Sequence, residues 1–590
     1  MRRIEKIGNT LKGLNAAVSR FPVTAAFLLA IAILNSIDIA DDTKDYFKYI
    51  LVLIVGSVLG AVFQVIYERF FYKSFARLIL TGTALLLTFG YYLIIEPLPR
   101  VTVEAGMRTI VALFVLFIAF LLLPVVKSRI SFNESFMAAF KALFIALFYS
   151  LVLYAGVSII IAGINTLLFP VDSDAYAHAA NIIFVLFATI YFLALIPVYP
   201  KGKENDEEDI RKEEIAHSKA VCPRFLEVLI SYIIIPLTAV FTVILLIYII
   251  INIGGRFWTD NLLEPMLVAY SIVVIIVYIL SSRLNNNFAM LFKKIVPKAM
   301  IPIVVFQTVA SILKISDSGI THSRYYAILY GIFAALAGIA FSILPVEKNG
   351  IVAAMLIVFS TISVVPPVDA FTVSRINQIN RLEDVLIKNN MLQNNQVTPN
   401  SSLSSEDKQK ITGAINYLEK MEYTKYISWL PEDYDFYSTF GFSRYDLPDK
   451  DRTYINLVLE QGAPVNIEGY DYLFRTSIFF AGQEGTTEQL GVIEKDGVKY
   501  TLNKKVSGGV CDIYISDQAG NTVISASTKE FFERFEDYSS ISTVISVEEA
   551  TYRVENGRAS IAIVLQILDM EQNSDTTYYN AEVYVLAGIK

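Results

Sequence analysis

Long apolar runs separated by short polar segments fill the first 368 residues of the chain. A helix that crosses a bilayer needs about 20 consecutive apolar residues, so this pattern predicts a membrane domain with eleven spans. The ninth run is short and contains Pro302, Gln307 and Thr308, so a re-entrant segment is an alternative there. The predicted spans cover residues 22–38, 47–67, 78–96, 107–126, 143–168, 179–199, 228–252, 264–281, 299–314, 325–344 and 350–366.

Beyond residue 368 the apolar runs become shorter and are interrupted by polar positions. Apolar residues at helical spacing predict a helix over 374–392, and Ser404 with Asp407 forms a capping pair that begins another. The polar stretch 394–407 between them predicts a linker.

From about residue 452 the pattern is typical of β-strands. Asp496–Gly497 and Asn556–Gly557 each lie between two alternating runs, which predicts two hairpins, with a helix over 528–538 between them. We expect the last two strands at 558–569 and 577–588. The predicted fold is an α-helical polytopic membrane domain followed by an α+β, mainly antiparallel β, extracytoplasmic domain. Its predicted parts are a membrane domain (1–368), a helical connector (369–422) and a β-rich domain (423–590).

Charge gives the expected orientation. The chain is 54% hydrophobic and only 18% charged, which excludes an ordinary soluble protein. With the N-terminus placed in the cytoplasm, alternate loops hold 22 Lys and Arg inside and 7 outside. Cytoplasmic loops carry this excess, so eleven crossings place the C-terminal domain outside the cell.

Several classes of chemistry are disfavoured by what the chain lacks. Residues 371–590 hold 20 Lys and Arg against 32 Asp and Glu, a poor balance for binding nucleic acid. The three histidines all precede residue 371, so the β-rich part has no Ser-His triad and no histidine-bound zinc. Cys222 and Cys511 lie in different parts, which argues against a disulfide framework. We expect no catalytic residue, metal or cofactor.

The polar stretch DSGITHSRYY separates the ninth and tenth predicted spans. Gly319 permits a tight turn there, and Thr321 or Ser323 can cap the next helix. Arg324 then falls in the first turn of a helix, where a cation costs a few tenths to about 1 kcal/mol.

Arg324 is therefore expected to have an anionic partner. The candidates are Asp317, Asp260, Glu264 and a lipid or substrate phosphate. The alternative is a packing clamp between interfacial tyrosines. The candidate ligand-binding residues are Asp317, Glu264, Thr321, Arg324 and Tyr325.

These segments also carry a family resemblance. The core Gly319–Thr321 with Arg324 and Tyr325, the run FKKIVPKAMIPIVVFQTVA before it and the later VSRINQINRL and VNIEGYDYL resemble the bacterial membrane family catalogued as domain of unknown function 4153. The resemblance implies a multi-pass protein of the bacterial cell envelope and plasma membrane. It brings no catalytic residues.

Three hypotheses for function follow. The first is a non-enzymatic protein whose helical part handles or senses an apolar or membrane-associated ligand. Its expected partners are membrane lipids and, through the outer domain, a cell-wall polymer or envelope protein. The second is a glycosyltransferase that acts on a lipid-linked sugar with acidic residues of the first outer loop, although this loop is short. Those residues are Asp38, Asp41, Asp42 and Asp45. The third is a lipid or polysaccharide transporter, for which Pro236 and Pro302 supply possible helix breaks.

Overall fold

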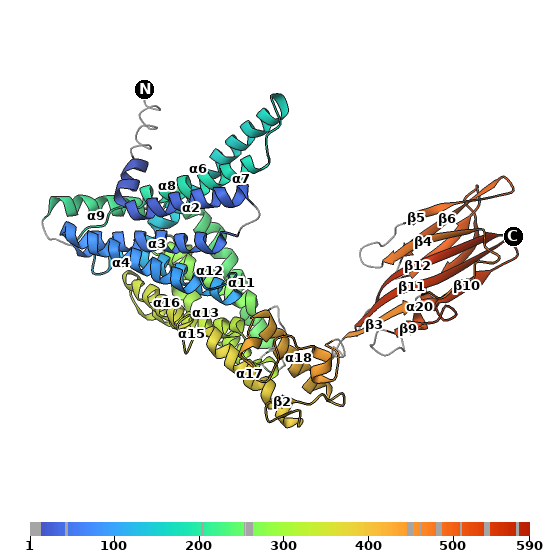
Figure 1. The fold of residues 1–590 in the computed structure, drawn as a ribbon. Coiled ribbons are helices and arrows are strands. Elements are labelled where there is room, and N and C mark those ends of the chain that lie inside the picture. Colours follow the sequence, from blue (N-terminus) through green and yellow to red (C-terminus); the bar gives the residue numbers. More distant parts are fainter. Residues whose placement is uncertain are drawn as a thin grey trace. The chain divides into compact units, whose positions relative to one another are not determined.

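The chain divides into two compact units, each described here by itself (Figure 1). The helical unit consists of Met1–Glu383 and Gly413–Ile427, and the β unit of Asp384–Thr412 and Ser428–Lys590. The three-part division proposed at residues 368 and 422 stays a prediction. The computed structural model describes residues 13–41, 45–201, 206–252, 254, 263–444, 452–460, 462–479, 487–507, 510–535, 543–573 and 577–590.

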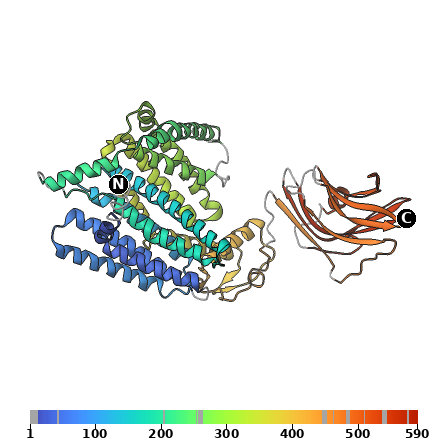
Figure 2. The same cartoon turned by 90° about the horizontal axis from the view of Figure 1, so that it is seen from above.

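Nine helical segments among the described residues are long and apolar enough to cross a membrane, and they lie in one bundle (Figure 2). They are Pro22–Ala40 (α2), Phe47–Phe70 (α3), Ser74–Ile95 (α4), Val103–Val125 (α5 and η1), Phe132–Leu167 (α6), Asp174–Leu195 (α7, η2 and α8), Arg224–Asn252 (α10, η3 and α11), Asn287–Ser318 (α13 and α14) and His322–Ile343 (α15). The subdivided segments consist of α5 (Val103–Leu122), η1 (Leu123–Val125), α7 (Asp174–Ala180), η2 (Asn181–Ala188), α8 (Thr189–Leu195), α10 (Arg224–Val228), η3 (Leu229–Ile234), α11 (Ile235–Asn252), α13 (Asn287–Leu313) and α14 (Ile315–Ser318).

Several predicted spans differ in length from the helices observed; the fifth, predicted from residue 143, begins at Phe132. The ninth is longer than predicted, because Asn286 caps α13, which begins twelve residues before position 299 and continues through two prolines. The re-entrant alternative rested on its shortness and on Pro302, Gln307 and Thr308, and the first of these grounds no longer holds. The eighth corresponds to α12 (Leu263–Leu280), and its apolar stretch, Glu264–Leu280, is 17 residues long. The eleventh contains a helix of only 13 residues, α16 (Gly350–Ile362).

The segment that contains α16 nevertheless runs the length of the bundle. At its beginning Asn349 donates to the side chain of Asn133, at the start of α6, at 3.1 Å. At its end Asp369 forms an ion pair with Arg108, near the start of α5. The last part of this crossing, from Ser363 to Asp369, is non-helical.

Two glycines of α3 allow its neighbours to approach closely. A Cβ atom on Gly56 would lie 2.8 Å from Cγ2 of Thr88 in α4 and 2.9 Å from the ring of Phe27 in α2. A Cβ atom on Gly60 would lie 3.0 Å from Oγ1 of Thr24 in α2. The small-xxx-small spacing therefore serves contacts within the chain.

The residues after the last crossing form a helix, as predicted, but the expected linker is partly ordered. The helix is α17 (Ala370–Lys388). Strands β1 (Leu392–Gln393) and β2 (Gln396–Val397) then pair across Asn394 and Asn395, which both have positive φ. Asparagine tolerates this conformation, so the polar stretch makes a tight hairpin. The next helix, α18 (Ser405–Lys420), begins with the predicted cap, because the backbone N–H of Asp407 donates to Oγ of Ser404.

The β unit contains two main sheets. One has the strand order β4-β12-β11-β3-β9, with β10 also paired to β11, and the other has the order β5-β6-β7-β8. All the pairs are antiparallel except β3 with β9. The strands are β3 (Arg452–Leu459), β4 (Tyr472–Phe479), β5 (Thr487–Lys495), β6 (Val498–Ser507), β7 (Val510–Ser516), β8 (Thr522–Ser527), β9 (Thr543–Ile545), β10 (Thr551–Glu555), β11 (Ala559–Asn573) and β12 (Thr577–Ile589).

Local predictions for this unit are confirmed where the chain signals its own turns. Asp496 and Gly497, both with positive φ, join β5 to β6, and Asn556–Gly557 joins β10 to β11. The last two strands pair along their length as β11 and β12. The predicted helix over 528–538 is α20 (Lys529–Glu533), and the end of that range lies outside the described residues.

The core of the β unit is shared by both sheets. Buried residues from the two sheets, such as Leu502 and Ile563, belong to one cluster. Cys511 lies in it with no exposed surface, and burial raises the pKa of its thiol to about 12. Both cysteines are free. Cys511 is therefore a packed core residue.

Gly56→Leu is predicted to destabilise the helical unit. The added side chain must displace Thr88 and Phe27, and overpacking of this kind costs about 1–3 kcal/mol. Thermal unfolding of the purified chain in detergent measures the effect as a lower midpoint. Gly82→Leu in α4 is the control, because a Cβ atom there meets nothing within 4 Å. Equal midpoints for the two variants would contradict close packing at α3.

Candidate functional site

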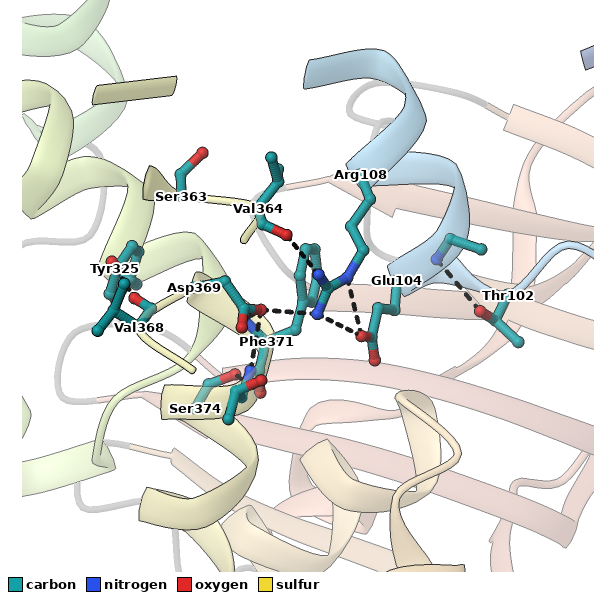
Figure 3. A network of polar contacts seen from close by, with 12 residues as sticks. Thr102, Glu104, Arg108, Tyr325, Ser363, Val364, Val368, Asp369, Phe371 and Ser374 are labelled. Atoms are coloured by element: carbon teal, nitrogen blue, oxygen red, sulfur yellow. Dashed lines mark hydrogen bonds and ion pairs between the residues drawn. The ribbon is translucent and has the colours of Figure 1, made fainter. Parts of the chain in front are cut away.

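An arginine in the second turn of α5 organises one end of the helical unit (Figure 3). Arg108 donates through Nε to Oε1 of Glu104 at 2.9 Å and through Nη2 to Oδ1 of Asp369 at 2.7 Å. Its Nη1 donates to the carbonyl oxygen of Val364. The guanidinium also lies over the ring of Phe371, 5.2 Å from its centroid.

The early end of α16 explains why these donors are needed. The carbonyl groups of Ser363 and Asp369 accept from backbone N–H groups of α17, at Ala370 and Val373. Those of Val364 and Val368 have no such partner, and carbonyl groups left unpaired are costly within a bilayer. Arg108 donates to the carbonyl oxygen of Val364, and the hydroxyl of Tyr325 donates to the carbonyl oxygen of Val368 at 2.5 Å. Side chains of α5 and α15 thus complete the crossing that α16 begins.

Asp369 joins this network to α17. Its side chain is fully buried, and Oδ1 accepts from the backbone N–H groups of Phe371 and Thr372 at 3.0 and 3.1 Å. It is thus both the N-terminal cap of α17 and the ion-pair partner of Arg108.

Tyr423 extends the network to the second part of the helical unit. Its hydroxyl donates to Oε2 of Glu104 at 2.7 Å. Burial, followed by this contact with the carboxylate, raises the pKa of Tyr423, so that its hydroxyl stays protonated and keeps donating. Residues on four segments are thereby held at one end of the bundle.

The hydrogen-bond partners of Arg324 differ from the anionic partners predicted. Its Nη1 donates to the carbonyl oxygens of Lys314 at 3.0 Å and Gly319 at 2.9 Å, and to Oγ of Ser318 at 2.5 Å. In the described part of the chain no carboxylate forms an ion pair with it. Two of the predicted candidates, Glu264 and Asp317, interact with its charge electrostatically and without a hydrogen bond. Asp260 lies outside the described residues, and the anionic partner of Arg324 stays a prediction.

Arg324 closes the end of the preceding helix. Carbonyl groups at a helix C-terminus carry partial negative charge, and those after α13 and α14 face the guanidinium. Gly319 has a φ of +71° and Thr321 accepts from the backbone N–H of Arg324 at 3.3 Å, so the predicted turn and cap are confirmed.

The other candidate ligand-binding residues have internal roles. Tyr325 belongs to the network around Val368, and Glu264 accepts from Oγ of Ser311 at 2.9 Å. Asp317 accepts from Oγ of Ser316 at 3.2 Å, and its carbonyl oxygen accepts from Arg381. Their role in ligand binding stays a prediction.

Two acidic residues in or next to the loop between α2 and α3 accept hydrogen bonds from the backbone. Asp38 accepts from the N–H of Tyr46 at 3.1 Å, and Asp45 accepts from the N–H of Phe47 at 2.9 Å, at the start of α3. Asp41 is described, whereas Asp42 lies outside the described residues.

Next to the Arg108 network lies an apolar cavity of about 510 Å³. Its walls come from five helices in which α5 packs on α16, α16 on α15, α15 on α12, α12 on α6 and α6 on α5. No charged residue lines it, and Tyr326 and Ser363 line the end near Arg108. Ile110 and Phe114 of α5 line it and stay exposed, so the cavity is open to the surroundings of the bundle.

Sequence reasoning missed the cavity and the role of Arg108. The lining residues are of the same apolar types that face lipid, so no sequence signal distinguishes them. Arg108 had a signal, because a charged side chain inside a span is costly and needs a partner. Its position in the second turn of α5 made it resemble an ordinary loop charge.

Comparison with known families agrees with this architecture. The family model described as "Domain of unknown function (DUF4153)" matches residues 23–401. The chain belongs to this family. The DUF4153 match includes Arg108, Asp369 and the helices around the cavity, and it ends before the first long strand, β3. No curated protein and no solved structure matches the chain.

Arg108→Gln is predicted to destabilise this DUF4153 protein strongly. The change leaves the buried carboxylate of Asp369 without its charge partner, which costs about 3 kcal/mol for buried pairs. The loss is measured as a lower thermal midpoint in detergent and faster proteolysis near α17.

Arg100→Gln provides the matched control. Arg100 pairs with Glu422 at 2.6 Å, but its side chain is 75% exposed, and exposed pairs contribute about 1 kcal/mol or less. Equal losses in the two variants would contradict the role given to Asp369.

Proposed function

We propose that this chain is a multi-pass protein of the bacterial plasma membrane that holds the apolar part of a lipid in its helical unit without catalysing a reaction. The observation that carries the proposal is the uncharged cavity among α5, α6, α12, α15 and α16. Its volume of about 510 Å³ lies in the range of about 300–1,000 Å³ that is usual for ligand pockets.

The accessibility of this cavity supports a lipid as the ligand. Ile110 is 67% exposed and Phe114 is 43% exposed, and both line the cavity. A lipid tail can enter between helices without crossing a polar surface, and the walls offer it no charged group to desolvate. Membrane lipids are therefore the proposed partners.

The proposed orientation places the N-terminus in the cytoplasm and the β unit outside. It rests on the excess of Lys and Arg in alternate loops. The β unit is then available to a cell-wall polymer or an envelope protein, which is also a proposal.

The two alternative functions have less support. A glycosyltransferase would use the acidic outer loop, but Asp38 and Asp45 already accept from backbone N–H groups. A transporter would place its site at interrupted helices, and neither α11 with Pro236 nor α13 with Pro302 lines the apolar cavity. The lipid-holding function therefore stands first.

Leu356→Trp is predicted to reduce the lipid that co-purifies with the chain. Leu356 lines the cavity, and a larger ring would fill it. We expect about tenfold less bound lipid, because overfilling costs at least about 1.4 kcal/mol of binding. Native mass spectrometry and lipid extraction after purification in mild detergent measure the amount.

Val358→Trp is the control on the same helix. Val358 is 55% exposed and does not line the cavity, so its substitution should leave bound lipid unchanged. A Leu356→Trp protein that folds and retains the wild-type amount of lipid would refute the proposed function.

The orientation predicts which introduced thiols can be labelled from outside whole cells. In a background with Cys222→Ser, Ala519→Cys in an exposed turn of the β unit should react with a membrane-impermeant maleimide. Ser218→Cys, exposed in the helix Glu207–Ala220 (α9), should react only after the cells are opened. Cys511 should stay unreactive until the unit unfolds, because it is buried. The reverse pattern would overturn the orientation.

A further inference from the structure

A second cavity, of about 530 Å³, lies at the other end of the same helices. The segment from Leu122 to Glu134, between α5 and α6, forms one wall. Ser282 and Arg283 after α12, and the residues from Val346 to Ala354 around the start of α16, form the rest. We call it the basic cavity, because Lys127, Arg129, Arg283 and Lys348 all line it.

Few of these positive charges are neutralised by the protein itself. Glu134, whose side chain is 2% exposed, accepts from Arg283 at 2.7 Å and contacts His217 at 2.5 Å, so it balances Arg283. Arg129, whose side chain is 68% exposed, lies 3.8 Å from Glu213, which is a long distance for an ion pair. Within the described chain no ion pair includes Lys127 or Lys348. Glu347 is the second carboxylate in the wall, which leaves four cations against two anions.

The backbone at Lys127 is held in an unusual conformation. Its φ is +54°, a region that residues other than glycine and asparagine seldom adopt. Arg69, only 7% exposed, fixes this turn by donating to the carbonyl oxygens of Val126 and Lys127 at 3.0 and 2.7 Å. Strained residues that the surroundings hold in place are often found at binding sites.

The basic cavity adjoins the apolar cavity. Phe132 lines both. Along the first turns of α16, Gly350, Ile351 and Ala354 line the basic cavity, whereas Val352 and Ala353 line the apolar one. A molecule with a negative head and an apolar tail fits this succession of surfaces.

We propose that the basic cavity binds the phosphate headgroup of an anionic glycerophospholipid of the phosphatidylglycerol type, with Lys127 and Lys348 as its principal contacts. The acyl chains then lie toward the apolar cavity, so the inference rests on the proposed function. Basic pockets between helices on the cytoplasmic side are known to bind anionic headgroups, and all four cations belong to loops expected on that side.

A lipid, and not a free phosphate, is the occupant that the geometry favours. A soluble anion would use the lysines alone and gain nothing from the apolar walls beside them. A lipid gains from both, since apolar surface is removed from water together with the charge contact.

The test titrates the delipidated full chain in detergent with short-chain lipids. The probes are dioctanoyl phosphatidylglycerol, dioctanoyl phosphatidylcholine and inorganic phosphate, and the readout is the shift of the thermal midpoint with probe concentration. The variant carries Lys127→Asn and Lys348→Gln. Asparagine tolerates positive φ, so the charge is removed without added backbone strain.

The wild-type chain should prefer phosphatidylglycerol to phosphatidylcholine. The double variant should bind phosphatidylglycerol about 25-fold more weakly, because each lysine near an anionic lipid contributes about fivefold, and its preference should disappear. A matched double variant, Lys73→Asn with Lys294→Gln, removes two cations from the same predicted side that do not line the cavity. It should keep the preference.

Three outcomes would overturn the inference. One is an unchanged preference in the Lys127 and Lys348 variant, and another is an equal loss in the matched variant. The third is saturation by inorganic phosphate at the concentration at which phosphatidylglycerol saturates, which would identify a free anion as the occupant.

Leu356→Trp separates this inference from the proposed function. If only Leu356→Trp loses phosphatidylglycerol, the lysine site is refuted and the lipid cavity stands. If only the lysine variant loses it, the lipid cavity is refuted and the anion site stands.

Discussion

The last carbonyl groups of a helix have no amide partner within the helix, and near a bilayer there is little water to replace it. In the described part of the helical unit, the same kind of contact supplies a donor at eight helix ends. A lysine or arginine from another segment donates to a carbonyl oxygen at the end. The acceptors and donors are Phe71 with Lys201, Glu96 with Lys48, Val126 with Arg69, Ile196 with Arg20, Val221 with Lys141, Ser282 with Lys293, Lys314 with Arg324 and Val364 with Arg108.

Each of these cations therefore serves two purposes. It satisfies a carbonyl group at the end of one helix, and it joins its own segment to that helix. A cation at a helix C-terminus is also favoured by the helix dipole. Arg324 is an example: its positive charge is unfavourable at the N-terminus of α15, which contains it, and favourable at the C-terminus of the helix before it.

Features that depend on neighbouring residues could be predicted from the sequence. The apolar runs predicted membrane-spanning helices, Thr321 and Ser404 predicted helix caps, and Asp496–Gly497 predicted a hairpin. The hairpin at Asn394 and Asn395 had a local signal too, but the polar residues around it resembled a linker.

What could not be predicted depends on distant contacts. Two acceptors of Arg108, Val364 and Asp369, are more than 250 residues away. The apolar cavity arises from the packing of five helices, and its lining residues are of the same types as those that face lipid. The shortness of α16 was hidden, because the residues after Ile362 are as apolar as a helix would be.

The separation between Arg108 and its partners also bears on how the protein is made. Ribosomes deliver α5 to the membrane long before Val364 and Asp369 exist. During that interval the guanidinium must remain hydrated at the membrane surface, which a long side chain in the second turn of a helix can do. The first four spans are thus inserted with one end unfinished. Release of Arg108 from water can occur only after the final crossing is synthesised, so the polar end of the bundle closes last.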